Sequence, residues 1–336
     1  MPTFSERATL LRDIERLLKL MILYNDDDDT EDEEEFENMV LFYEFVSSRR
    51  YINERSPIPK SLEFCNAIFN YPDDAFRTIA RCSKASFHRL LSKIKNYQVF
   101  SNNSQHKQAS VEVQLLIVLN RLGCDGNGAS IDRTGLFFGR SVGTIEKFTD
   151  RIFEAILSLE KDYVFWPDAA ERSDISHRMD INHGLKHAVG IVDGTPVNFY
   201  QKPGIDGEAY FNRKGRYAIN LTLVCDDRAF IRYYVVGRTG PTPDNQILEQ
   251  SRMLTEPDKF LSMLQCLLAD VGYVLGVYVC TPYRKPASLI EENHIFNVLF
   301  SSARVIIEHV NGMLKSRFGS LKGIRIQVSK REDLQE

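Results

Sequence analysis

The chain has 336 residues, 43% of them hydrophobic and 26% charged, so it can bury a sizeable core and is long enough for two domains of ordinary size. Its six cysteines form no CxxC pair and have no histidines at zinc spacing, which argues against a disulfide framework or a zinc module. No stretch is apolar enough to cross a membrane, and the first helix lacks the uninterrupted apolar block of a signal peptide, so we expect an intracellular protein.

The N-terminal part, residues 1–60, reads as a helix followed by an acidic run. Apolar residues recur over 8–24 at alternating spacings of four and three, which predicts one helical stripe packed within its own domain rather than in a coiled coil. The run DDDDTEDEEEFE at 26–37 carries ten negative charges, and without it the net charge of −4 would become +6. Such a run cannot bury enough apolar surface to fold, so we expect a disordered segment.

Residues 61–165 have the pattern of a helical domain. Three helices are expected at 111–122, 130–138 and 141–159, with a tight turn between the last two and Ser141 as the N-cap of the third. This is the spacing of a helix-turn-helix module, and a plain helical bundle is the equally weighted alternative. The third helix should bury Ile145, Phe148, Ile152 and Ile156, which leaves Arg140, Lys147 and Arg151 outward as candidate DNA contacts.

A mixed α/β domain is expected after a boundary near 165–187. Short β-rich runs, a helical segment and a long closing helix follow one another in this part of the chain. The predicted strands are 188–200, 217–226, 230–237 and 266–279, the helical segment is 243–254, and the closing helix is 301–321.

Three carboxylates interrupt apolar stretches of this second domain. Asp193 lies inside the first strand, Asp270 closes the run CLLAD, and Glu308 lies within ARVIIEH of the closing helix. Each alone could be a turn residue, a cap or the partner of an arginine one helical turn away. Packed together, they would repel one another unless a cation neutralised them. Hard divalent ions take such oxygen ligands, and two of them can drive an in-line displacement at a phosphodiester.

Several motifs of this region resemble the DDE endonuclease domain of PIF/Harbinger-type transposases and of the nuclease-like host proteins derived from them. The resemblance runs in order over residues 188–325, and it is carried by VDGTPV, RKGRYAINLTLVCD, LLADVGYVL, TPYRKP and FNVLFSSARVIIEHVNGMLKSRFGSLKG. It implies an RNase H-like fold in which Asp193, Asp270 and Glu308 form the metal-binding catalytic triad, with Mg²⁺ or Mn²⁺ as the cofactor. It also implies cleavage of DNA in the nucleus, with a separate Myb/SANT-like protein supplying specific DNA binding and nuclear import.

The sequence departs from the family pattern at two loops. GPTPDN at 240–245 stands where the family usually has P-G-S-x-H-D, so Pro243 replaces a histidine while Asp244 is kept. DVGYVL stands for the commoner D-S-G-Y-P-L, and the chain ends at REDLQE where relatives usually continue into another helix. These departures favour a second hypothesis, a catalytically inactive transposase-derived protein that binds DNA or a partner. The oligomeric state stays open, a homo-oligomer included.

Basic residues follow the first strand and the closing helix. The basic residues after the first strand, between which Tyr210 and Phe211 are interleaved, are interpreted as phosphate contacts, and a solvated hairpin is the alternative. Those at the end of the helix extend the basic surface beyond Glu308, although the helix dipole alone would also favour them there. The candidates are Lys202, Arg213, Lys214 and Arg216 after the strand, and Lys315 and Arg317 in the helix.

Overall fold

The computed structural model of the chain describes residues 6–24, 30–49, 59, 62–102, 105 and 107–326. The chain divides into two compact units, residues 1–58 and residues 59–336. Each unit is described by itself. Among the described residues, no helix is long and apolar enough to cross a membrane.

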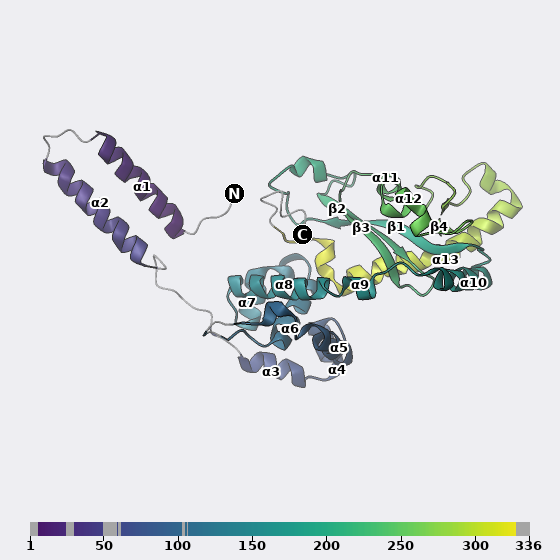
Figure 1. The fold of residues 1–336 in the computed structure, drawn as a ribbon, viewed down its shortest axis with the longest axis horizontal. Coiled ribbons are helices and arrows are strands. Elements are labelled where there is room, and N and C mark those ends of the chain that lie inside the picture. The colour runs from purple at the N-terminus through teal and green to yellow at the C-terminus, as the bar shows by residue number, and fades with distance from the viewer. Residues whose placement is uncertain are drawn as a thin grey trace. The chain divides into compact units, whose positions relative to one another are not determined.

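The first unit is a helical hairpin (Figure 1). Helix α1 spans Glu6–Tyr24 and α2 spans Thr30–Ser48, and Arg7 at the start of α1 donates to the carbonyls of Val46 (3.2 Å) and Ser47 (2.8 Å) at the end of α2. The expected disorder of the acidic run is therefore wrong for residues 30–37, which begin α2, while residues 26–29 lie outside the described part. Glutamate is a good helix former, and negative charge near a helix N-terminus is favoured by the helix dipole.

The second unit begins with a helical region built around α6 (Val111–Gly123). Seven consecutive residues of α6, Val113–Leu119, are buried, because neighbouring helices cover the helix on all sides. The helices expected at 130–138 and 141–159 are present as α7 (Ile131–Phe138) and α8 (Val142–Leu157), joined by a turn in which Gly139 has φ 60°. The other helices of this region are α3 (Leu62–Asn70), α4 (Asp73–Ala80), α5 (Lys84–Ile94) and α9 (Glu160–Tyr163).

A five-stranded mixed sheet follows, with the strand order β3-β2-β1-β4-β5. The pairs β1/β2 and β2/β3 are antiparallel, whereas β1/β4 and β4/β5 are parallel. This is the RNase H-like architecture that the sequence predicts. The strands are β1 (Ala188–Asn198), β2 (Ala218–Cys225), β3 (Ile231–Thr239), β4 (Cys266–Leu268) and β5 (Val279–Cys280).

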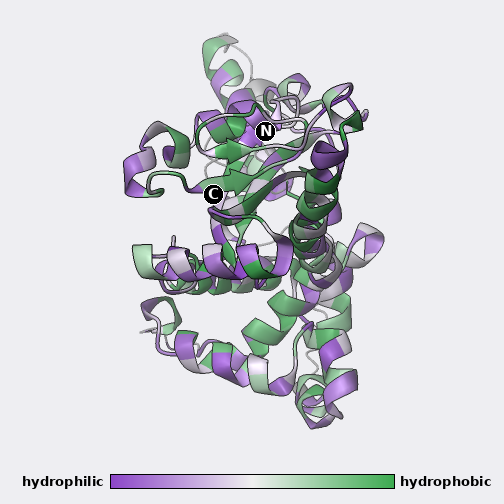
Figure 2. Cartoon of the chain, turned by 90° about the vertical axis from the view of Figure 1, so that its right-hand side faces the viewer, coloured by the Kyte–Doolittle hydropathy of each residue, from purple (hydrophilic) through white to green (hydrophobic). Residues whose placement is uncertain are grey.

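Helices cover both faces of the sheet. On one face, α10 (Ala169–His183) and α13 (Glu291–Arg317) bury Ile175, Phe300 and Ile307 against β1, β2 and β4. On the other face, α11 (Asp244–Glu249) and α12 (Arg252–Thr255) cover a second apolar cluster. The apolar colouring of the strands in Figure 2 reflects this burial on both sides.

Three predicted elements differ in extent from the observed ones. The run at 266–279 is not one strand, because it contains β4, a turn stabilised by a hydrogen bond from Tyr273 N to Asp270 O (3.0 Å), and the start of β5. The helical segment at 243–254 is divided into α11 and α12 by a turn in which Ser251 N donates to Leu248 O (3.0 Å). The closing helix begins ten residues earlier than predicted, at Glu291.

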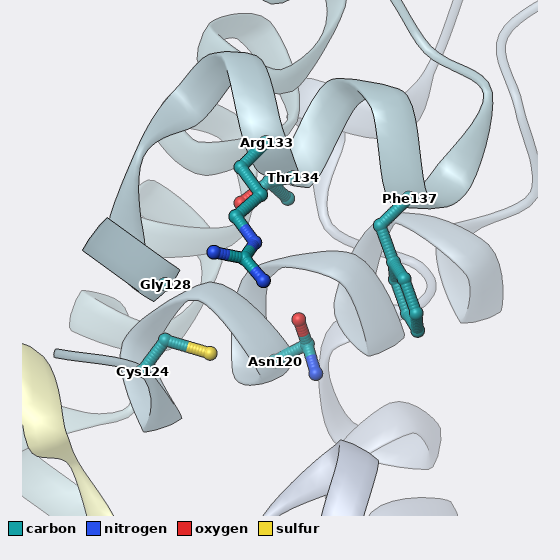
Figure 3. Close-up of a pocket in the computed structure, with 6 residues that line it drawn as sticks. All are labelled: Asn120, Cys124, Gly128, Arg133, Thr134 and Phe137. Atoms are coloured by element: carbon teal, nitrogen blue, oxygen red, sulfur yellow. The ribbon is translucent and has the colours of Figure 1, made fainter. Parts of the chain in front are cut away.

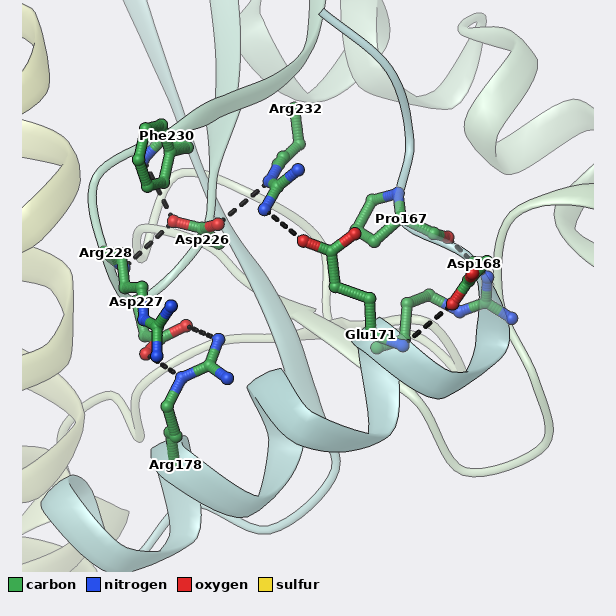
Figure 4. A network of polar contacts seen from close by, with 10 residues as sticks. Pro167, Asp168, Glu171, Arg178, Asp226, Asp227, Arg228, Phe230 and Arg232 are labelled. Atoms are coloured by element: carbon green, nitrogen blue, oxygen red, sulfur yellow. Dashed lines mark hydrogen bonds and ion pairs between the residues drawn. The ribbon is translucent and has the colours of Figure 1, made fainter.

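Helix α10 is fixed to the β2–β3 turn by a buried polar network (Figure 4). Asp226, fully buried, accepts from the backbone N–H groups of Arg228 and Phe230 at 2.9 Å each and from Arg232 Nε at 2.8 Å. Arg232 in turn donates to Glu171 of α10 at 2.5 Å. Two turns further along α10, Arg178 donates to both carboxylate oxygens of Asp227, at 2.6 and 2.8 Å. The buried charges are thus paired and hydrogen-bonded, as burial requires.

The helical region and the sheet region are joined at the end of α13. Arg81, which follows α4, donates to the carbonyl of Ser316 (2.9 Å) and to that of Arg317 (3.0 Å). These carbonyls belong to the last turn of α13, where no following helical N–H group is available to donate to them. A 3₁₀ turn directly after α13, Gly319–Lys322, packs against α6, and a Cβ on Gly319 would lie 2.8 Å from the Gly123 carbonyl oxygen.

Candidate active site

Asp193 and Asp270 are brought side by side by the parallel pairing of β1 and β4. Ile191 pairs with Leu268, so the residues two positions further along each chain, Asp193 and Asp270, come level at the same end of the two strands. Side chains alternate along β1, and because Ile191 belongs to the cluster under α10 and α13, Asp193 also faces α13.

Helix α13 presents a polar stripe to β1. Arg304, Glu308, Asn311 and Lys315 follow one another at spacings of four, three and four, which places them on one helix face. Asn311 Nδ2 donates to Asp193 Oδ2 at 3.0 Å. Lys315 Nζ donates to Thr195 Oγ1 (2.6 Å) and to the Pro196 carbonyl (2.7 Å). The stripe thus lies along β1 on the side that carries Asp193.

Arg304 lies among the three predicted carboxylates. Its Nη1 is 3.2 Å from Asp270 Oδ1, and its Nη2 is 3.8 Å from Asp193 Oδ1 and 4.0 Å from Glu308 Oε1. The side chain of Arg304 is only 15% exposed, whereas that of Glu308 is 58% exposed. The guanidinium therefore takes the position of the shared cation that three converging carboxylates require.

A cavity of about 450 Å³ opens beside this cluster. Asp193 and Asp270 line it together with Asp244, Tyr273 and a rim of loop residues that includes Arg213 and Lys214. Asn220 shapes the rim, because its side chain donates to the carbonyl of Thr242 at 2.8 Å. Glu308 is not among the described residues that line the cavity, so the three aspartates face it without the glutamate.

Burial raises the pKa of two of these aspartates. For Asp193, burial is the main cause, the Arg304 charge opposes it, and the neighbouring Asp244 adds to it. For Asp244, burial again raises the pKa and the Asp270 charge adds to it, while Arg213 and Lys214 lower it. Burial also lowers the pKa of Lys315. Burial is thus the main cause of all three shifts, and repulsion between neighbouring aspartates adds to it for Asp193 and Asp244.

The donor set fits a hard divalent cation in its chemistry. All the carboxylates supply oxygen ligands, which Mg²⁺ and Mn²⁺ prefer, and Asn311 Oδ1 is buried without a hydrogen-bond partner. In the described part of the chain, no three His, Cys, Asp or Glu side chains converge closely enough to hold an ion by themselves. An ion here would have to exchange places with the Arg304 guanidinium, or bind fewer carboxylates together with water and substrate oxygens.

The basic candidates in the sheet region differ in how free they are. Arg213, Lys214 and Arg216 are exposed in the segment before β2, and the first two lie at the cavity. Lys202 forms an ion pair with Glu208, and Lys315 is half-buried with both of its bonds directed to β1. Arg317 is exposed at the end of α13.

In the helix-turn-helix candidate, the outward position predicted for Arg140 is wrong. Arg140 is only 9% exposed, because its backbone turns back onto α7, where its N–H donates to the Gly135 carbonyl (2.8 Å). Its side-chain Nε and Nη2 have no hydrogen-bond partner among the described residues. Lys147 is exposed and Arg151 is half-buried, and Glu146, Asp150 and Glu154 are exposed on the same helix. This mixed charge offers little attraction to phosphate.

A separate cavity of about 310 Å³ lies beside α7 in the helical region (Figure 3). Arg133 and Phe137 of α7 face Asn120 and Cys124 at the end of α6 across it. Asn120 already donates to the Ile79 carbonyl at 3.1 Å, and no carboxylate lines this cavity among the described residues. Within the described residues, this cavity therefore lacks the carboxylate ligands that a divalent cation would need.

The site contains four residues that the sequence alone does not identify as part of it. Arg304 and Asn311 come from α13, and Asp244 and Tyr273 line the cavity. The regular spacing of Arg304, Glu308, Asn311 and Lys315 was the available signal for the first two. No local signal marked Asp244 or Tyr273, because their proximity to Asp193 arises only when the sheet forms.

Comparison with protein families identifies the C-terminal region. Residues 192–336 match the family described as DDE superfamily endonuclease. No solved structure matches the chain at a significant level.

Curated relatives are identical to this chain at about a quarter of the aligned positions. Proteins named "Putative nuclease HARBI1" are 25% identical over 209 residues in Xenopus laevis, 26% over 227 in Bos taurus and 26% over 209 in Homo sapiens. The matches cover 62%, 66% and 61% of this chain, and 59%, 63% and 58% of the respective relatives. The chain thus spans about three fifths of the length of the curated relatives that it matches.

Proposed function

We propose that this protein cleaves DNA phosphodiester bonds in a reaction that depends on divalent cations, and the match of residues 192–336 to the DDE superfamily endonuclease family supports this proposal. The observation that carries the proposal is the convergence of Asp193, Asp270 and Glu308, from three separate elements, on the single guanidinium of Arg304. Structural ion pairs rarely need three carboxylates for one cation, whereas two-metal phosphoryl-transfer sites do need such an excess of negative charge.

The roles of the residues follow from their positions. Asp193, held by Asn311 and placed between the cavity and α13, is suited to contact both ions of a two-metal centre. Asp270 would hold one ion at the end of β4, and Glu308 would complete a shell and orient the attacking water. The bound ions, Mg²⁺ or Mn²⁺, would activate the water and stabilise the leaving oxygen. Hydrolysis would form a P–O bond to the oxygen of the attacking water and break the P–O3′ bond. The proton that the water loses would be balanced by the proton that the 3′ oxygen gains as it leaves as a hydroxyl.

DNA would reach the carboxylates across the rim that carries Arg213 and Lys214. Both side chains are exposed beside the cavity, where they can neutralise phosphates that flank the reacting bond. Arg317, together with Lys147 and Arg151 of α8, would contribute weaker contacts to the flanking duplex. A separate Myb/SANT-like protein would supply sequence specificity and import into the nucleus.

A catalytically inactive DNA-binding protein is the second candidate. Two observations favour it: the guanidinium of Arg304 already lies among the three carboxylates, and Pro243 stands at the N-terminus of α11 in place of a histidine of the family. Under this proposal the basic rim would still bind DNA, but no bond would be broken.

A plasmid-nicking assay with Mg²⁺ or Mn²⁺ separates the two candidates. We expect the wild type to nick supercoiled DNA and both Asp193→Asn and Glu308→Gln to lose at least 100-fold of that rate. Asp258→Asn, which removes an exposed carboxylate outside the site, is the matched control and should nick normally. Nicking that persists in both site variants would refute the metal-triad mechanism, and absence of nicking and of metal binding in the wild type would favour the inactive protein.

A further inference from the structure

The helical hairpin of the first unit buries little of its apolar surface. Among its described residues, only Ile14 of α1 and Val46 of α2 are buried hydrophobic side chains. Two helices with so small a core are marginally stable alone, because packing of an apolar face supplies most of the stability of a helix. Large apolar side chains remain 44–49% exposed on both helices, and they include a leucine pair, Leu17 and Leu20 of α1, and a phenylalanine pair, Phe42 and Phe45 of α2.

The leucine pair and the phenylalanine pair lie on the same side of the hairpin. The leucines follow Ile14 by three and six positions, so they are rotated from it by about −60° and −120° around α1. The phenylalanines precede Val46 by four positions and one, which rotates them from it by about −40° and −100° around α2. Because the two helices are antiparallel, the same sense of rotation from the buried residue leads to the same side of the pair. The four side chains therefore form one apolar face.

The two pairs lie at opposite ends of this apolar face. The leucine pair is in the second half of α1, and the phenylalanine pair is in the second half of α2, close to the end where Arg7 bonds the last turn of α2. A two-fold axis that reverses the helix direction brings the leucine pair of one copy onto the phenylalanine pair of a second copy, and the reverse. An isologous dimer requires such a self-complementary surface.

The charges of the hairpin favour this antiparallel arrangement. Helix α2 begins with an acidic segment in which Glu34, Glu35 and Glu37 are exposed. If two hairpins packed in the same direction, the acidic starts of both α2 helices would meet at one end and repel each other. Reversal of one hairpin places the acidic segments at opposite ends, so the apolar faces can join without this repulsion.

We propose that α1 and α2 form a dimerisation element: two copies of the chain pack the leucine pair of one hairpin against the phenylalanine pair of the other in an antiparallel four-helix bundle. Such a bundle buries the face that a single hairpin leaves exposed. The interface uses no residue of the sheet region. It is therefore independent of the nuclease activity proposed above, and either proposal can fail without the other.

Sedimentation equilibrium of the full chain at micromolar concentration tests this assignment. We expect the wild type to have twice the mass of the 38.6 kDa chain. The double variants Leu17→Glu/Leu20→Glu and Phe42→Lys/Phe45→Lys should each raise the dissociation constant of the dimer by at least about 10-fold, because each buries unpaired charge in an apolar interface. Circular dichroism of each variant establishes that it folds.

Two exposed residues on the other side of the hairpin supply matched controls. Lys19 and Glu44 are rotated from Ile14 and Val46 in the opposite sense, by about +140° and +160°. Lys19→Glu changes the net charge as much as the double glutamate variant does, and Glu44→Lys changes it as much as the double lysine variant. Both control variants should dimerise as the wild type does.

Mixing the two double variants separates an interface from a folding defect. In the mixed dimer, a glutamate pair faces a lysine pair at one contact, and the other contact is that of the wild type. We therefore expect the mixture to dimerise with a dissociation constant within about 10-fold of the wild-type value. A monomeric wild type, double variants that dimerise normally, or a mixture that stays monomeric would each overturn the assignment.

Discussion

Arg304 Nη1 lies 3.2 Å from Asp270 Oδ1, although the two residues come from α13 and from the end of β4. Arg304→Met should lower the free energy of unfolding of the metal-free protein by about 1–2 kcal/mol, because three carboxylates lose their shared cation. The figure is below that of a fully buried pair, since Asp270 and Glu308 are about half exposed. Mn²⁺ should then raise the melting temperature more than it does in the wild type, because the ion no longer competes with the guanidinium.

Urea denaturation of the metal-free proteins measures the first effect and thermal denaturation with and without Mn²⁺ measures the second, and Arg304→Lys, which keeps the charge, is the control. An Arg304→Met variant that is as stable as the wild type without metal would contradict the counter-ion role.

Asn311 positions Asp193 through the bond from Nδ2 to Oδ2, at 3.0 Å. Asn311→Leu should reduce nicking by 10- to 100-fold, because a ligand that loses its outer partner no longer keeps its orientation. Ser301→Ala, an exposed change on the same helix, is the control. Nicking rates at increasing Mn²⁺ concentration measure the effect, and unchanged rates at every concentration would show that Asp193 needs no such support.

Lys315 and Lys214 should behave differently although both were predicted to bind DNA. Lys315→Met breaks two bonds to β1 and should lower the free energy of unfolding by about 1–2 kcal/mol. Lys214→Met removes an exposed charge, so stability should not change, but the slope of log affinity against log salt should fall by about 1. Urea denaturation and salt-dependent DNA binding of both variants test this contrast, and a smaller salt slope in Lys315→Met than in Lys214→Met would reverse the assignment.

Asp226 is the centre of the network that attaches α10 to the sheet (Figure 4). Asp226→Ala leaves Arg232 without its buried partner and two backbone N–H groups without acceptors, which should destabilise the protein by about 3–5 kcal/mol. Urea denaturation measures the loss. Asp258→Ala, at an exposed position outside the network, is the control and should change stability by less than about 0.5 kcal/mol.

Cys280 on β5 should be the first cysteine to be alkylated near neutral pH. A hydrogen bond with Cys266 lowers the pKa of the Cys280 thiol to about 7, whereas burial raises the pKa of Cys65, Cys82, Cys124 and Cys225. The reactive thiolate of Cys280 should therefore increase as the pH rises through about 7. Iodoacetamide labelling followed by mass spectrometry measures each site, and Cys266→Ala should shift the midpoint to higher pH. A midpoint that does not move would show that Cys266 is not the cause.

Much of the sheet region could be predicted from its sequence. Asp193, Asp270 and Glu308 each break an apolar run, and such interruptions are visible wherever a polar group lies in a buried element. The alternation of strands and helices likewise indicated a mixed sheet covered by helices. Both inferences depend only on periodicity and on neighbours along the chain.

The partners of these carboxylates could not be predicted in the same way. Arg304 bonds Asp270 only because β4 lies parallel to β1 beneath α13, and Asp244 meets Asp193 only because α11 returns to the opposite face. Arg140 shows the reverse error: the apolar face of the following helix predicts an outward position for it, but the turn before that helix folds back onto α7. The charge of the acidic run predicts disorder, whereas the helix propensity of its glutamates favours α2.

The bonds from Arg81 to the last carbonyls of α13 make the helical region part of the structural support of the helix that carries Glu308. A fragment that began at Trp166 would keep every carboxylate of the site, yet it would leave the end of the helix that carries Glu308 uncapped and would expose the surface that packs on α6. The two regions are therefore not interchangeable modules. A replacement for the helical region would have to supply an equivalent donor at the end of α13, which restricts the domain rearrangements that this architecture can tolerate.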